Sequence, residues 1–145
     1  MSDAACQEVS AVSELSCGVR AGAGGNRPQA SAVVDPSGVW RSRRLGGEMT
    51  LVADGDEIRG VYQTAVGEVG PGEKFELRGF RSGEVLAFIV HFRGARSLTA
   101  WVGRIVVEAG VETLETLWHL GRQERSAAQR WAAMIAGADS FERGC

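Results

Sequence analysis

Hydroxyl-bearing and aromatic side chains alternate with other residues along three segments, so in an extended backbone they would share one face of each strand. They are Tyr62, Thr64 and Val66 in the first segment, Ser97, Thr99, Trp101 and Gly103 in the second, and Leu114, Thr116, Trp118 and Leu120 in the third. A purely structural core favours aliphatic residues, because each buried unpaired hydroxyl costs about 1–3 kcal/mol. In a single strand such hydroxyls could simply bond the backbone. The agreement of three strands predicts a small-molecule cavity with apolar walls and a few convergent polar groups.

The composition excludes several other classes of function. The chain has 145 residues, which fits one domain, and its 16 basic and 18 acidic side chains give a formal net charge of −2. Without a basic region to track phosphates, a nucleic-acid partner is not expected. The apolar runs are far shorter than the ~20 residues of a membrane-spanning helix, so we expect a soluble protein without a membrane partner.

Three cysteines lie near the two ends of the chain, at Cys6, Cys17 and Cys145. Their odd number and wide spacing predict neither a disulfide framework nor a metal site, and no cofactor is expected. The first residues lack the basic and apolar stretches of a secretory signal, which favours a cytoplasmic location.

The chain divides into an arm and a domain. Residues 1–37 read as an N-terminal arm, with a weak short helix at 3–19 and a flexible glycine-rich linker at 21–28. Residues 38–145 read as an all-β domain.

Short alternating segments separated by Gly, Asp, Asn or Pro predict eight strands in this domain. The predicted strands are 38–43, 47–53, 57–66, 73–80, 85–92, 97–107, 111–121 and 139–143. The alanine-rich stretch from Arg125 to Ala136 predicts a helical turn or short helix before the last strand. Eight sequential antiparallel strands most simply close into an up-and-down β-barrel, whose interior is filled by side chains or holds one small ligand.

Six motifs in order along residues 38–143 resemble the avidin/streptavidin family of biotin-binding barrels. These motifs are Gly38-Val-Trp40, Leu45-Gly-Gly-Glu-Met-Thr50, Gly60-Val-Tyr-Gln-Thr-Ala-Val-Gly67, Ser97-Leu-Thr-Ala-Trp-Val-Gly103, Thr116-Leu-Trp-His-Leu120, and Trp131 followed by Gly137-Ala-Asp-Ser-Phe141. The resemblance implies a binding protein for biotin or a biotin-like compound, with no catalysis. It also suggests a secreted protein, in contrast to the N-terminal sequence.

The resemblance assigns a role to each matching position. Tyr62 matches a donor to the ureido oxygen of biotin, whereas a family asparagine falls on Ser42 or Arg43 and a family serine on Gly47. Thr64 and Asp139 match the acceptors for the two ureido nitrogens. The other matching positions are Thr99 for the thioether, Ser97 for the valerate carboxylate, Phe92, Trp101, Trp118 and Leu120 for the apolar walls, and Leu45, Val66 and Gly67 for the mouth and its closing loop.

Trp131 matches a tryptophan that reaches into a neighbouring subunit's site, which implies a homo-oligomer, either a tetramer or a dimer. Two of these residues also have a plainer interpretation. Asp139 would then be a cap or turn residue, and Trp131 would pack on its own barrel. The arginines at 41, 43 and 44 would form a solvated rim, and His91 and His119 fall on outward faces.

An alternative function is a barrel of this family adapted to another small ligand, possibly as a biosynthetic enzyme. Tyr62 and Asp139 would then serve as acid and base, and Arg43 would pair with a substrate carboxylate. A purely structural oligomerisation barrel is a third hypothesis, which would leave the hydroxyl-rich interior without a use.

Overall fold

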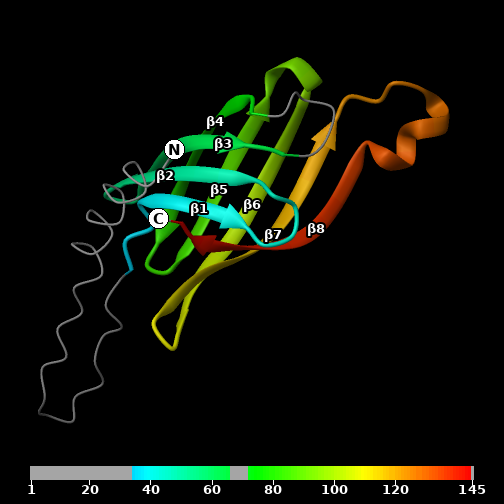
Figure 1. Ribbon diagram of the computed structural model, residues 1–145. Helices are drawn as coiled ribbons and strands as arrows, with labels where there is room; N and C mark the ends of the chain where they lie inside the picture. Colours follow the sequence, from blue (N-terminus) through cyan, green and yellow to red (C-terminus); the bar gives the residue numbers. More distant parts are fainter. Residues whose placement is uncertain (1–33, 66–71, 145) are drawn as a thin grey trace, which may run out of the picture.

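The computed structural model describes residues 34–65 and 72–144, whose backbone forms eight strands. The strands are β1 (Gly38–Ser42), β2 (Glu48–Asp54), β3 (Glu57–Gln63), β4 (Lys74–Ser82), β5 (Val85–Phe92), β6 (Ser97–Glu108), β7 (Val111–Arg122) and β8 (Met134–Arg143). Each strand pairs antiparallel with the next, and β8 pairs with β1, so the sheet closes into a barrel (Figure 1). The predicted eight-stranded up-and-down barrel is confirmed. Most of the arm predicted at 1–37, including its helix and linker, lies outside the described residues.

The strand boundaries differ from the prediction mainly at β8. A 3₁₀ helix, η2 (Ala127–Ala132), precedes this strand as predicted, but β8 begins at Met134 rather than at residue 139. Gly121 pairs with Met134 and Leu120 with Ile135, because the long strand β7 needs a hydrogen-bonding partner along its whole length. Pairing with β7 therefore overrides the helical preference of the alanine-rich segment from Met134 onward, and the predicted start of the last strand at residue 139 was wrong.

Alternation along the strands separates the interior from the outer wall. In β5, Leu86, Phe88, Val90 and Phe92 are buried, whereas the residues between them are exposed. The same period of two places Ser97, Thr99 and Trp101 of β6 inside the barrel. The register between strands then decides which inward side chains meet.

The interior is packed with apolar side chains at the end that holds the β2–β3, β4–β5 and β6–β7 turns. The fully or almost fully buried side chains of this core include Trp40, Met49, Leu51, Ile58, Leu77, Leu86, Leu114 and Phe141. Any ligand space must therefore lie toward the opposite end of the barrel.

The segment 34–37, just before β1, packs over this filled end. The indole Nε1 of Trp40 donates a hydrogen bond to the carbonyl oxygen of the buried Pro36 at 2.8 Å. The Arg143 guanidinium lies 4.4 Å above the Trp40 ring and donates to two carbonyl oxygens of the segment, at 2.6 and 2.7 Å. These four residues, which the sequence assigned to the arm, thus form a plug at the closed end of the barrel.

Two further findings concern membranes and metal ions. Within residues 34–65 and 72–144, no helix is long and apolar enough to cross a membrane. The same residues contain no cluster of three or more His, Cys, Asp or Glu side chains that could hold a metal ion.

Candidate functional site

A cavity of about 270 Å³ opens at the end of the barrel opposite the plug. Its walls come from β3, β5, β6 and β7, from Thr64 just after β3, and from the loops β1–β2, β5–β6 and β7–β8. The lining residues are Leu45, Tyr62, Thr64, Phe92, Ala95, Ser97, Thr99, Trp101, Trp118, Leu120, Arg122, Gln123 and Arg125. The structure thus brings together the hydroxyls and aromatic rings that the sequence placed on separate strands.

The pairing of β6 with β7 sets one wall of the cavity. Trp101 stands opposite Trp118, and Thr99 stands opposite Leu120. The ring of Trp118 lies directly over Gly137 of β8, where a Cβ would approach the ring to 2.4 Å. A residue larger than glycine at that position would push the indole into the cavity, so Gly137 sets the width of the site.

Aromatic contacts hold Trp101 at the centre of the barrel. Its ring centroid lies 5.9 Å from Tyr62, 6.1 Å from Trp118 and 5.6 Å from Phe141. Within the described residues, the buried indole nitrogens of Trp101 and Trp118 have no hydrogen-bond partner. Buried polar groups are normally paired, so these two enclosed N–H groups are exceptions within the barrel, and the cavity is bounded by the faces of the indole rings.

Tyr62 supplies a neutral phenol to the cavity. Burial raises the pKa of its hydroxyl above the usual 10.0, and the nearby Asp139 carboxylate raises it further, although a hydrogen bond with Thr64 acts in the opposite direction. A Cβ on Gly47 would lie 2.5 Å from the phenolic oxygen, so only glycine at position 47 allows Tyr62 this conformation. At neutral pH the Tyr62 hydroxyl is therefore a hydrogen-bond donor rather than a base.

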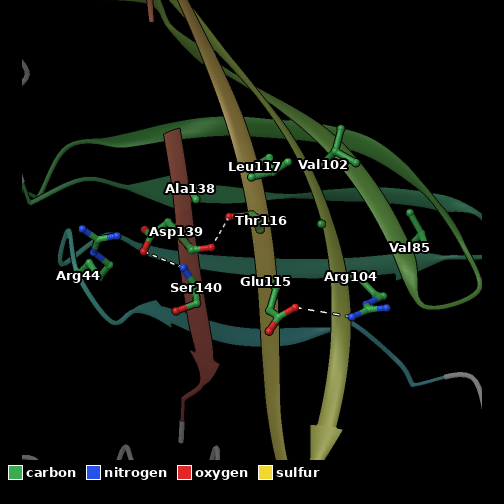
Figure 2. Close-up of a pocket in the computed structure, with 11 residues that line it drawn as sticks. Arg44, Val85, Val102, Arg104, Glu115, Thr116, Leu117, Ala138, Asp139 and Ser140 are labelled. Carbon is green, nitrogen blue, oxygen red and sulfur yellow. Dashed lines mark hydrogen bonds and ion pairs between the residues drawn. The ribbon is translucent and has the colours of Figure 1, made fainter. Parts of the chain in front are cut away.

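Asp139 lies on the inner side of β8, where it joins the strands that close the barrel. Its Oδ2 accepts a hydrogen bond from Ser42 Oγ at 2.7 Å, and its Oδ1 accepts from the backbone N–H of Ser140 at 2.8 Å. The neighbouring Thr116 hydroxyl donates to the Asp139 carbonyl oxygen at 2.8 Å (Figure 2). The side chain is 5% exposed and sits within the strand, so the interpretation of Asp139 as a cap or turn residue was wrong.

Ser42, rather than Arg43, occupies the position next to Asp139. Ser42 Oγ also accepts a hydrogen bond from the backbone N–H of Leu45 at 2.9 Å, which shapes the β1–β2 loop. The Arg43 side chain is 56% exposed and pairs with Glu142 at 2.9 Å. Arg43 therefore belongs to the solvated rim, and its prediction as an inward ligand-binding residue was wrong.

Ser42, Gly47, Trp131 and Asp139 are not among the residues that line the cavity. Trp131 is on η2 with its side chain 80% exposed, so it does not pack on its own barrel. His91 and His119 are exposed on the outer wall, as predicted. Val66 and Gly67 lie outside the described residues.

Sequence reasoning missed four lining residues, namely Ala95, Arg122, Gln123 and Arg125. Three of them follow Gly121, where the alternation that identified the other walls ends. A usable signal was present, because Arg122 stands opposite Ser97 once β6 and β7 are aligned.

A second hollow, of about 580 Å³, lies on the outer wall of β6, β7 and β8 (Figure 2). An ion pair between Arg104 and Glu115, with a separation of 3.7 Å, crosses its surface. This hollow is more open to solvent than the cavity inside the barrel.

Comparison with known proteins agrees with this geometry. The avidin family model matches residues 30–144. Among solved structures, xenavidin is 26% identical, with a TM-score of 0.66 over 77% of this chain and 99% of that one. A biotin-binding protein from chicken is 31% identical, with a TM-score of 0.65 over 75% of this chain and 95% of the other.

Short afifavidin in complex with biotin is 26% identical, with a TM-score of 0.63, and the match covers 77% of this chain and 91% of that one. A comparison with curated proteins gave no match. The closed barrel, its cavity and the family match over nearly the whole chain lead to one conclusion: this chain belongs to the avidin family.

Proposed function

We propose that this protein binds biotin or a closely related ureido compound inside the barrel and does not transform it. The observation that carries the proposal is the cavity itself, in which hydroxyl side chains of β3 and β6 and two indole rings line one space. The family match and the biotin complex of short afifavidin support biotin as the guest.

The size and walls of the cavity suit a small bicyclic ligand. Its volume of about 270 Å³ lies just below the range of about 300–1,000 Å³ that is usual for ligand pockets. The rings of Phe92, Trp101 and Trp118 would enclose an apolar body, and the hydroxyls of Ser97 and Thr99 would fix its orientation. A preformed cavity needs little reorganisation on binding, which favours affinity.

The ureido oxygen would have fewer donors here than the family pattern provides. Tyr62 remains available, but Gly47 has no side-chain donor, and Ser42 already donates its hydroxyl hydrogen to Asp139. An unsatisfied buried carbonyl costs about 1–3 kcal/mol per missing donor, which lowers affinity tenfold or more. We therefore expect binding in the nanomolar to micromolar range.

Catalysis by these residues is disfavoured by their contacts. The raised pKa of Tyr62 keeps its phenol protonated at neutral pH. Asp139 already accepts two hydrogen bonds, and Arg43 pairs with Glu142 outside the cavity. The acid, base and carboxylate-pairing roles that the enzyme hypothesis gave to Tyr62, Asp139 and Arg43 thus do not fit the contacts of these three residues.

We also propose that copies of this chain assemble through the outer wall, as a homotetramer. Large apolar side chains are exposed there, including Phe80, Ile89, Val102, Leu117, Trp131 and Met134. Monomeric proteins seldom expose so many together, so a second copy would cover them. In the assembled protein, Trp131 of one copy would close the cavity of its neighbour.

Calorimetric titration with biotin and with desthiobiotin tests the binding proposal. Tyr62→Phe and Asp139→Ala are expected to weaken binding, whereas Asp56→Ala, in the distant β2–β3 turn, serves as a matched control and leaves it unchanged. The absence of heat and of thermal stabilisation with both compounds would contradict the proposal and favour another small ligand.

A further inference from the structure

Among the described residues, Arg122, Gln123 and Arg125 lie at the mouth of the cavity. Two of these lining residues are arginines, and no Asp or Glu is among the described residues that line the cavity. The acidic Glu124 between them pairs with Arg130, at 3.3 Å. The described lining therefore combines an apolar, hydroxyl-bearing interior with guanidinium groups at the rim.

The register places Arg122 on the cavity side of its strand. Arg122 stands directly opposite Ser97, whose buried hydroxyl lines the same cavity. Residues directly opposite in an antiparallel pair project their side chains to the same face, with Cβ atoms about 4.5–5.5 Å apart. The base of the Arg122 side chain therefore lies beside Ser97, at the outer edge of the cavity.

The guanidinium of Arg122 is held by a hydrogen bond through its Nε nitrogen. Its Nε donates a hydrogen bond to the carbonyl oxygen of Ala132 at 2.8 Å, and its backbone N–H donates to the Ala133 carbonyl oxygen at 2.9 Å. No hydrogen bond or ion pair with a residue of 34–65 or 72–144 engages its two terminal nitrogens. The hydrogen bond from Nε therefore orients the Arg122 guanidinium, and its two terminal nitrogens can donate hydrogen bonds to an anion.

The rim around Arg122 adds further donors. Arg96 donates to Gln123 Oε1 at 3.1 Å, so a third guanidinium lies next to the mouth. A carboxylate at this point would meet a charge-assisted donor, and hydrogen bonds of that kind are roughly twice as strong as neutral ones. A neutral amide or ester at the same place would gain much less.

We infer that Arg122 is a specificity-determining residue, and that the site selects ligands with an apolar body and a free terminal carboxylate over the same ligands with a neutral tail. The inference rests on the proposed function and refines it, because it concerns the far end of the same guest. It predicts that the protein prefers a free acid such as biotin to a conjugate joined through that acid.

The test compares biotin with biotin methyl ester by calorimetric titration of the full chain. The unmodified protein is expected to bind the acid about tenfold or more tightly than the ester, with the preference falling as salt concentration rises. Arg122→Gln removes the preference by weakening the acid alone, and Arg122→Lys retains part of it. Arg59→Gln, which removes the same charge near the closed end, leaves the preference intact.

The outcomes separate the two proposals. Equal affinity of the unmodified protein for acid and ester would overturn this inference while leaving the proposed function in place. Unchanged preference in Arg122→Gln would also overturn it. An Arg122→Gln variant that loses affinity for acid and ester equally would show that Arg122 only supports the β7–β8 loop. Failure of both compounds to bind the unmodified protein would contradict the proposed function, and the inference with it.

Discussion

The Ser42 hydroxyl donates a hydrogen bond to the Asp139 carboxylate at 2.7 Å, although the two residues are 97 positions apart in the chain. The bond crosses the pair β1–β8, which closes the barrel. It therefore ties together the two strands at which the sheet closes.

This link predicts that Ser42 and Asp139 are coupled in stability. Asp139→Ala removes the acceptor for Ser42 and for the Ser140 amide, and we expect it to lower the free energy of unfolding by about 1–3 kcal/mol. Ser42→Ala leaves the buried carboxylate with one donor fewer and should cost a similar amount. Denaturant unfolding of both single variants and the double variant measures the coupling. Strictly additive losses would contradict a direct interaction.

Gly47→Ser tests whether the family-type donor can be restored. The serine Cβ would lie 2.5 Å from the Tyr62 hydroxyl, so the variant must displace that ring. We expect it to lower stability by about 1–3 kcal/mol and to bring no gain in biotin affinity. Unfolding curves and titration measure the two effects. Tyr62→Phe in the same background removes the closest atom and should recover part of the stability. Tighter biotin binding by Gly47→Ser at an unchanged free energy of unfolding would contradict the expected clash with Tyr62.

The ionisation of Tyr62 can be followed without interference, because it is the only tyrosine in the chain. In the folded protein its pKa is raised by burial, so the phenolate should appear in ultraviolet absorbance only above pH 10.0. The folded state then holds the proton more tightly than the unfolded state. Its contribution to stability is complete below pH 10.0 and is lost as the pH rises through the folded pKa. A folded-state transition at or below pH 10.0 would contradict the buried placement.

Trp131→Ala tests the proposed contribution of a neighbouring copy. The side chain is exposed on its own barrel, so its removal should leave the unfolding of an isolated subunit nearly unchanged. We expect weaker biotin binding together with a loosened oligomer, measured by titration and by sedimentation. Val107→Ala, an exposed apolar residue near the closed end, serves as a size control. Unchanged affinity and particle mass would show that Trp131 serves no neighbour.

The strands were largely predictable because a closed barrel imposes a strict inside–outside alternation along each strand. The turns of the hairpins are also marked by turn-forming residues in the sequence. The Asp54-Gly55 turn, for example, was read from its residues, and Gly55 adopts the positive φ of 60° that such a turn requires. The same alternation identified Thr99, Trp101 and Trp118 as inward residues. In these strands, the burial of side chains follows the two-residue period of the sequence.

The errors occur where long-range contacts outweigh local pattern. The start of β8 at Met134 depends on the length of β7, and the exclusion of Arg43 depends on Glu142, which lies across the barrel closure. Arg122 was missed for a similar reason, since its place at the mouth follows from its alignment with Ser97. None of these pairings is encoded in the neighbouring residues.

The last described residue of the chain, Gly144, lies at the closed end of the barrel, beside the plug of residues 34–37. Gly144 hydrogen-bonds to Val39 at that closed end, while η2 lies at the opposite end (Figure 1). A tether joined beyond Gly144 would therefore hold the protein to a solid support with its entrance directed toward the solution. Immobilised in this orientation, the barrel would keep the entrance of its cavity clear of the surface.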